Sequence, residues 1–418
     1  MGSGEKTLDQ VQRLALEGGT PVRRLAFAPW PVFAEDEIEA VAAVLRSGKV
    51  NYWTGEQSQE FEREFAQFVG VKYAVALANG TAALELALYA LGIVPGDEVV
   101  VPSKTFIASA SCVVRLGATP VVADVDPDSQ NITAASMARV LTARTKAVIA
   151  VHLAGWPCEM DGILALAKER GLFVVEDCAQ SVGARYQDRM TGSIGDIGAF
   201  SFCQDKIITT GGEGGMLVTD SREFWEKAWS YKDHGKSYAA AFEREHPPGF
   251  RWLHENFGSN WRITEMQSAI GRLQLKKLPQ WLALRRRNAA LLCLGLSTVP
   301  GLRLALPPAH SEHAYYKYYV FLRPEMLRAG WNMQRLLDAI GAEGIPCGVG
   351  ACSEIYLEKA FVNAGIGPNE PLPVASRLAD SSLMFLLHPG LIEQDMRDTC
   401  TALAKVMRAA TIQSPLSK

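Results

Sequence analysis

Hydrophobic and polar positions along the chain follow two alternating patterns. Between residues 35 and 70, apolar residues recur at helical spacing in EDEIEAVAAVLRSGK and SQEFEREFAQFVG, and glycine stops both runs, as it does for many helices. From residue 73 onward, short β-branched runs alternate with helical ones. The predicted strands are YAVALA, EVVVPS, TPVVADV, KAVIAVHL, FVVEDC and GAFSFC. Because these runs lack polar alternation, they indicate strands covered on both faces and an α/β fold with a mainly parallel sheet.

The same patterns divide the chain into three parts. We expect an N-terminal arm over residues 1–33, a large α/β domain over 34–275 and a small C-terminal α+β domain over 276–418. A long helical pattern, TEMQSAIGRLQLKKLPQWLALR, leads out of the large domain. Beyond it, YYKYYVFL predicts one clear strand of the small domain.

Composition and charge exclude several classes of protein. The 418 residues carry a net charge of −3 without a basic stripe, so neither a nucleic acid nor an anionic membrane is an expected partner. Apolar runs stop well short of the roughly 20 residues that span a bilayer, and the N-terminus lacks the pattern of a secretory signal. The eight cysteines form no CxxC pair and have no metal-ligand spacing. We therefore expect a cytoplasmic protein without a metal site.

Ligands of an open α/β sheet bind beyond the carboxyl ends of its strands. The first such segment is ANGTAAL, in which Gly80 permits a tight turn and Thr81 with Ala82 begins a helix. The free N–H groups of a helix start form an anion site suited to phosphate. Taken alone, this segment is more often an ordinary turn with Thr81 as the helix cap.

A second segment, VVEDCAQSVGA, places two acids at the end of an apolar strand. Alternation along a strand sends Glu176 and Asp177 to opposite sides. A buried carboxylate needs a cationic or protonated partner, and a protonated ring nitrogen is one candidate. A helix cap with a structural ion pair is an equally good interpretation of these residues by themselves.

The third segment, SFCQDKIITTGGEGG, holds Lys206 in a loop after a strand. A lysine acts as a nucleophile when burial or nearby positive charge keeps it neutral part of the time. The alternative to a nucleophile is a surface lysine paired with Asp205. A lone lysine is more often solvated than catalytic. The glycines match neither GxGxxG nor GxxxxGK[ST], which disfavours a nicotinamide enzyme or a nucleotide hydrolase.

Together the three segments point to one cofactor. Pyridoxal 5'-phosphate (PLP) needs a phosphate cradle, a lysine for a Schiff base, an acid at the pyridine nitrogen and a flat group on the ring. The helix start at residues 80–82 with Ser201, then Lys206, Asp177 and Phe106, would supply these four groups.

Several ordered motifs resemble the DegT/DnrJ/EryC1/StrS family of PLP-dependent aminotransferases, which has the aspartate-aminotransferase-like fold (fold type I). The motifs are GKVNYWTGEQSQEFEREFAQFVG, ALANGTAALELAL, PGDEVVVPSKTFIASA, VHLAGWPCEMD, VVEDCAQSVGARY, GDIGAFSFCQDKIITTGGEGGMLVT and GSNWRITEMQSAIGRLQLKKL. They cover roughly residues 30 to 280, and HAYYKYYVFL and FLLHPGL extend the resemblance into the C-terminal domain.

The resemblance implies a role for each matching residue. Lys206 matches the Schiff-base lysine, and Asp177 matches the partner of the pyridine nitrogen. Ser201, five residues before the lysine, matches the serine that holds the phosphate. The backbone of Thr81 and Ala82 matches the phosphate cradle.

Three further positions follow from the same resemblance. Gln180 matches a residue near the ring hydroxyl, and Phe106 occupies the ring-stacking position. Asn260 matches an asparagine that reaches the phosphate of the neighbouring subunit. Family members work as homodimers with shared active sites, so we expect a homodimer here.

The resemblance also implies the reaction. One branch of the family has histidine in place of the lysine and removes a sugar hydroxyl, whereas Lys206 places this chain with the aminotransferases. We expect a ping-pong transfer of an amino group from glutamate or glutamine to a keto sugar, often nucleotide-linked. The alternatives are an aminotransferase for a keto-cyclitol of the scyllo-inosose type, a PLP-dependent sugar dehydratase and a non-catalytic regulatory protein.

The identity of the substrate is less readable. Gln204 and Asp205 stand where many family members have Pro-Thr or Ala-Thr, which leaves the substrate subgroup open. Trp53 and His313 are candidate substrate residues, but core packing or an interface would explain them equally well.

Overall fold

The structure is a computed structural model that describes residues 12–246, 248–249 and 251–412. Residues 1–11 of the predicted arm and 413–418 of the predicted small domain lie outside the described residues.

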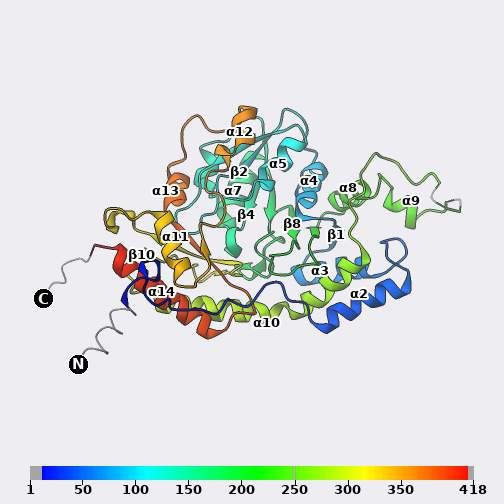
Figure 1. The fold of residues 1–418 in the computed structure, drawn as a ribbon. Coiled ribbons are helices and arrows are strands. Elements are labelled where there is room, and N and C mark those ends of the chain that lie inside the picture. Colours follow the sequence, from blue (N-terminus) through cyan, green and yellow to red (C-terminus); the bar gives the residue numbers. More distant parts are fainter. Residues whose placement is uncertain (1–11, 247, 250, 413–418) are drawn as a thin grey trace, which may run out of the picture.

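A seven-stranded sheet forms the centre of the molecule (Figure 1). In spatial order its strands are β1 (Tyr73–Leu77), β9 (Gly215–Thr219), β8 (Ile197–Ser201), β5 (Phe173–Asp177), β4 (Thr145–Val151), β2 (Glu98–Pro102) and β3 (Thr119–Ala123). Neighbouring strands from β8 to β3 are parallel, whereas β9 runs antiparallel to both β1 and β8. The predicted mainly parallel sheet is therefore confirmed, and β9 is the strand that the hydrophobic pattern did not predict.

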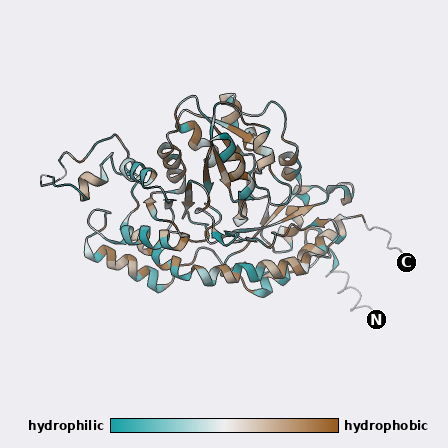
Figure 2. Cartoon of the chain, turned by 180° about the vertical axis from the view of Figure 1, so that it is seen from behind, coloured by the Kyte–Doolittle hydropathy of each residue, from teal (hydrophilic) through white to brown (hydrophobic). Residues whose placement is uncertain are grey.

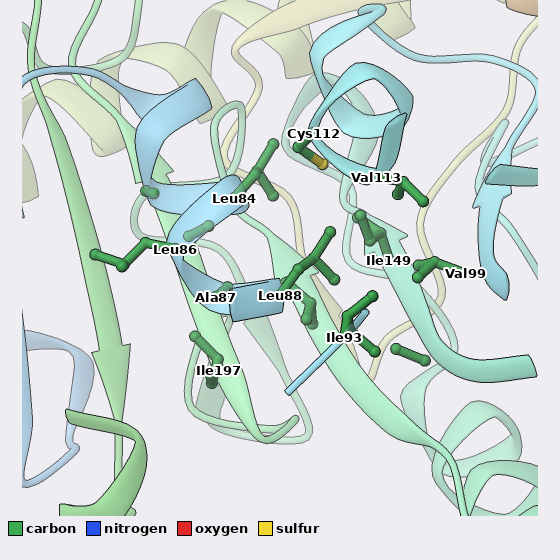
Figure 3. Close-up of a cluster of buried hydrophobic side chains, with 14 of the residues drawn as sticks. Leu84, Leu86, Ala87, Leu88, Ile93, Val99, Cys112, Val113, Ile149 and Ile197 are labelled. Atoms are coloured by element: carbon green, nitrogen blue, oxygen red, sulfur yellow. The ribbon is translucent and has the colours of Figure 1, made fainter. Parts of the chain in front are cut away.

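Helices cover both faces of this sheet. Successive residues of a strand point to opposite faces, and the strands carry apolar side chains on both, so each face needs a covering layer. Val75 and Leu77 pack on one face, while Ala74 and Ala76 pack on the other. The first face is covered by α4 (Gly80–Ala90), α5 (Ala108–Arg115) and α8 (Arg222–Lys232). The second is covered by α3 (Gln57–Val69), α6 (Ala134–Ala138), α7 (Met160–Arg170) and α10 (Glu265–Leu296). Figure 3 shows side chains of α4 against strand residues such as Ile149 and Ile197.

The two N-terminal helices end where the sequence predicts. Helix α2 (Glu35–Ser47) is followed by Gly48 with φ of 69°, and α3 by Gly70 with φ of 86°, a left-handed conformation that glycine adopts without strain. Helix α10 runs to Leu296 and contains Pro279. Both α2 and α3 pack against α10.

A second sheet follows α10 in the chain. Its four strands are antiparallel neighbours in the order β10 (Leu302–Arg303), β12 (Lys317–Leu322), β14 (Ser382–Leu386) and β13 (Cys347–Gly348). Helices α11 (Met333–Ala342) and α14 (Glu393–Ala410), with the second half of α10, share its core. The predicted boundary after residue 275 falls inside α10, and the division into three parts stays a prediction.

Shorter elements complete the described chain. A small sheet joins β11 (Ser311–Glu312), β6 (Arg185–Tyr186) and β7 (Arg189–Met190). The remaining helices are η1 (Ala15–Glu17), η2 (Leu153–Gly155), α9 (Tyr238–Phe242), η3 (Pro324–Met326), η4 (Ile355–Leu357), α12 (Lys359–Ala364) and α13 (Pro373–Ser381). Figure 2 shows hydrophobic residues concentrated in the central strands and mixed hydropathy along the long outer helices. Within the described residues, no helix has both the length and the apolar character that crossing a bilayer requires.

Candidate active site

A cavity of about 1110 Å³ opens at the carboxyl ends of the parallel strands. It lies between the start of α4, the start of α5, the ends of β5 and β8, the start of β12 and the segment that precedes η4. All the predicted cofactor residues except Asn260 line it, namely Gly80, Thr81, Ala82, Phe106, Asp177, Gln180, Ser201 and Lys206. The fold thus brings together four separate stretches of the sequence, residues 80–82, 106, 177–180 and 201–206.

The N-terminus of α4 borders the cavity as a potential anion site. Asn79 caps the helix, and its Oδ1 accepts a hydrogen bond of 2.8 Å from the N–H of Ala82. In the part of the chain that the structure describes, the N–H groups of Gly80 and Thr81 have no acceptor. A Cβ atom on Gly80 would lie 2.6 Å from the Cβ of Ser201, so only glycine fits this close approach. The two free N–H groups at this helix start and the neighbouring Ser201 hydroxyl together fit a phosphate group.

Asp177 ends β5 and is almost fully buried in the cavity wall. Its carboxylate accepts hydrogen bonds of 2.7 Å from the Ser109 hydroxyl and 3.1 Å from the N–H of Ala179. Burial raises the pKa of Asp177 above its usual value, although these two hydrogen bonds act in the opposite direction. A buried carboxylate of this kind favours a protonated nitrogen as its partner, which fits a pyridinium ring.

Lys206 lies in the loop between β8 and β9 and projects into the same cavity. Its Nζ donates a hydrogen bond of 3.3 Å to the Tyr316 hydroxyl and lies 3.7 Å from Oδ1 of Asp205. The backbone of the loop is fixed from the other side, because Trp30 Nε1 donates a hydrogen bond of 3.0 Å to the carbonyl of Lys206. The side chain is 17% exposed, which leaves the amine accessible from the cavity.

Two more predicted residues complete the cavity wall. Phe106 is 68% exposed and lines the cavity at the start of α5, where its ring is available for stacking. Gln180 is held by its side chain, because its Oε1 accepts a hydrogen bond of 2.8 Å from the N–H of Ala154. The donors of its amide group therefore remain for a ligand in the cavity.

Comparison with known proteins identifies the family of this chain. The sequence profile of the DegT/DnrJ/EryC1/StrS aminotransferase family matches residues 31–404. The chain belongs to this family. The predicted resemblance, the α/β fold of the family and the assignment to PLP-dependent aminotransferases are thereby confirmed.

Individual relatives within the family are similar over most of their length. A solved structure of an aminotransferase from Psychrobacter cryohalolentis matches with a TM-score of 0.89 and 52% identity, covering 92% of this chain and 99% of that chain. The GDP-perosamine synthase of Caulobacter vibrioides is 37% identical over 350 residues, which are 83% of this chain and 89% of that protein. The L-glutamine:2-deoxy-scyllo-inosose aminotransferase of Streptoalloteichus tenebrarius is 36% identical over 421 residues, with 94% and 97% covered.

Three predicted residues lie away from the cavity. Asn260 is exposed and pairs through its backbone with Asp233. Its predicted contact with a neighbouring subunit stays a prediction. Trp53 packs among aromatic residues and donates a hydrogen bond of 2.7 Å to Asp233. His313 is buried and stacks on Tyr315 at 3.9 Å, and burial lowers its pKa to about 3. In this single chain neither Trp53 nor His313 lines the main cavity.

Sequence reasoning missed two residues that touch the predicted site. Ser109 holds Asp177, and Tyr316 contacts Lys206. The signal for Ser109 was its position three residues after Phe106, one turn along the same helix start. Tyr316 lies 110 residues from Lys206, and nothing local in the sequence connects the two.

Glu176, the neighbour of Asp177, points to the opposite side of the sheet. It receives hydrogen bonds from the backbone N–H groups of Gly192, Ile194 and Gly195 and contacts His152 Nε2 at 3.0 Å. Burial alone would raise the pKa of Glu176, but His152 and these N–H groups hold it below its usual value. Glu176 therefore serves the fold, whereas Asp177 faces the cavity.

The close approach of Gly80 to Ser201 makes the phosphate cradle testable. In Gly80→Ala the new Cβ would overlap Ser201, and relieving an overlap of this kind costs about 1–3 kcal/mol. We expect the affinity for PLP to fall by about tenfold or more, measured by absorbance titration of the cofactor-free protein. Gly162→Ala is the matched control, because its Cβ would lie 3.4 Å from Ala134. Equal PLP affinity in Gly80→Ala and wild type would contradict the cradle.

Proposed function

We propose that the chain transfers an amino group from glutamate or glutamine to a nucleotide-linked keto sugar in a ping-pong reaction. The observation that carries this proposal is the position of Lys206. Its amine enters the same cavity as the helix start at Gly80 and the buried carboxylate of Asp177. These are the three groups that a PLP-dependent aminotransferase needs.

The residues of the cavity would have separate roles in the reaction. PLP, when bound, supplies an electron sink for the negative charge that develops at the substrate's Cα. Gly80, Thr81 and Ser201 would hold its phosphate, and Asp177 would keep a proton on its ring nitrogen. The Nζ of Lys206 would take the proton from the substrate's Cα and deliver it to C4′ of the cofactor.

The size of the cavity supports a large acceptor. Its volume of about 1110 Å³ exceeds the usual range of roughly 300–1000 Å³ for ligand pockets. This space suits a cofactor together with a nucleotide-linked sugar better than a cofactor with a lone ring. Arg115 lines the cavity and is exposed, so it is available to bind a diphosphate. The similarity to a GDP-perosamine synthase points in the same direction.

A keto-cyclitol is the second candidate acceptor. It is favoured by the 36% identity to an aminotransferase for 2-deoxy-scyllo-inosose, which covers 94% of this chain. A cyclitol of this kind carries no nucleotide, so it would leave the part of the cavity near Arg115 unused.

A panel of acceptors tests the proposal. Nucleotide-linked 4-keto and 3-keto sugars and keto-inositols are each incubated with PLP and either glutamate or glutamine, and the amine product and the consumed donor are quantified. We expect an amino sugar from a nucleotide-linked substrate, with one donor consumed for each product. Reaction with keto-inositols alone would favour the cyclitol candidate. Loss of a sugar hydroxyl without amine transfer would indicate a dehydratase, and no reaction with any acceptor would overturn the proposal.

We also propose that the active form is a homodimer with shared active sites. Asn260 is exposed in the single chain, and the segment around it presents Trp252 at 82% and Phe257 at 98% exposure. Exposed aromatic side chains are typical of contact surfaces between proteins. Analytical ultracentrifugation is expected to give the mass of a dimer, and a monomeric mass with full activity would contradict this arrangement.

A further inference from the structure

Asp205, which immediately precedes the catalytic lysine, is the shared counter-charge of two lysines. Its Oδ1 lies 3.7 Å from Lys206 Nζ, and its Oδ2 lies 3.7 Å from Lys317 Nζ. Among the described residues, no other carboxylate forms an ion pair with either amine.

Tyr316 connects the carboxylate to Lys206. The phenol donates its proton to Oδ2 of Asp205 and accepts a hydrogen bond of 3.3 Å from Lys206 Nζ. The Lys206 and Lys317 amines also lie 4.9 Å and 4.5 Å from the centre of the Tyr316 ring. Because the hydroxyl has only one proton, the bond to Asp205 turns its lone pairs toward Lys206.

We propose that the Asp205 carboxylate and the Tyr316 hydroxyl form a dock that holds the Lys206 amine whenever this amine is not bonded to cofactor. The inference rests on the proposed function, in which the Lys206 amine would be freed from the cofactor when the donor reacts and would rejoin it only when the aminated product leaves. Asp205 and Tyr316 act through Lys206 and are positioning residues. Lys317, which shares the carboxylate, is the competing charge that weakens the dock.

The geometry matches a dock that releases its amine readily. The separation of 3.7 Å between Asp205 and Lys206 exceeds the roughly 2.7–2.9 Å of a tight charge-assisted hydrogen bond. The Asp205 side chain is 54% exposed, so water screens its charge in part. A tighter and drier ion pair would keep the proton on Lys206 and prevent the amine from acting as a base.

The charges around the dock keep the carboxylate ionised. Burial opposes it, but Lys206, Tyr316 and Lys317 together hold the pKa of Asp205 below its usual value. Burial lowers the pKa of Lys317, with Lys206 and Arg285 acting in the same direction. The other titratable groups that face these residues are Asp177 on β5, Cys203 in the same loop, Arg285 on α10 and His388 after β14.

Competitive acetylation tests the dock directly. The full-length protein, freed of PLP, is labelled with trace acetic anhydride over a range of alkaline pH values, and mass spectrometry follows Lys206 against the exposed Lys168. In Asp205→Asn we expect the Lys206 labelling profile to move to lower pH by about one unit, because the amine loses its counter-charge. In Lys317→Met the profile is expected to move to higher pH, because a like charge is removed. Asp205→Glu keeps the carboxylate and is expected to stay near wild type.

Opposite shifts in the two variants separate a charge effect from a structural one. The dock is overturned if the Asp205→Asn and wild-type profiles coincide, or if Asp205→Asn and Lys317→Met shift in the same direction. Should Asp205→Asn unfold, Lys206 would label like Lys168, and the Lys317→Met shift then decides alone. Labelling involves no turnover, so its result is independent of the acceptor panel. If the acceptor panel shows amine transfer but neither variant shifts the labelling profile, the dock is rejected. If both labelling shifts occur but no acceptor is aminated, the proposed function is rejected.

Discussion

Replacing Lys206 with alanine is expected to abolish amine transfer, with a loss of at least about 10⁴-fold in kcat. In the proposed reaction this variant would lose both the amine that holds the cofactor and the group that moves the substrate's Cα proton. Other side chains cannot take over either role. The second lysine of the cavity, Lys317, contacts Asp205 and the Tyr316 ring, and it begins β12 rather than the loop after β8.

Sodium borohydride provides a readout besides activity. Reduction of the wild-type protein with PLP, followed by digestion, is expected to add the cofactor mass to the peptide that contains Lys206. Lys206→Ala should show no such adduct, whereas the matched variant Lys317→Ala should retain it on Lys206. An adduct on Lys317 in the wild type, or measurable turnover by Lys206→Ala, would contradict the assignment of Lys206.

The sequence was sufficient for most of the fold because the signals that set it are local. All six predicted apolar runs form strands of the central sheet, and α2 and α3 end beside the glycines that predict their ends. Strand β9 was missed because its residues, GMLVT, follow the glycine run directly and form only one short apolar stretch. Helix α10 extends past the predicted stretch because its second half packs in the core of the second sheet, which a local pattern does not reveal.

For the candidate site, sequence reasoning found the residues at strand ends and missed those that distant packing supplies. Asp177, Ser201 and Lys206 follow or end strands of one sheet, and parallel strands bring such ends to one edge. Tyr316 reaches Lys206 only because β12 lies against this edge. The contact between Asp205 and Lys317 has the same origin. The sequence contains Asp205 beside Lys206 but does not indicate which other groups it would contact.

Replacing Asp177 with asparagine is expected to lower kcat by about 10²- to 10³-fold while PLP remains bound. The amide keeps the shape of the side chain but carries no negative charge, so it cannot hold a proton on the ring nitrogen, and the electron sink weakens. Retention of PLP is checked by absorbance after desalting, and kcat by donor consumption with the best acceptor of the panel. Turnover near the wild-type rate in Asp177→Asn would argue against this role.

Ser109→Ala is the matched control that links this loss to the charge of Asp177. The Ser109 hydroxyl donates a hydrogen bond of 2.7 Å to Asp177 and lowers the pKa of this carboxyl against the effect of burial. Without Ser109 the pKa of Asp177 rises further, so the carboxylate becomes protonated at a higher pH. The acid limb of kcat should therefore move to higher pH by about one unit, since hydrogen bonds to charged groups contribute roughly 1.5–3 kcal/mol. Above this limb Ser109→Ala should approach the wild-type rate, whereas Asp177→Asn should stay slow at every pH. A uniform loss of rate in Ser109→Ala without a shifted limb would mean that Ser109 positions the site rather than tuning the charge of Asp177.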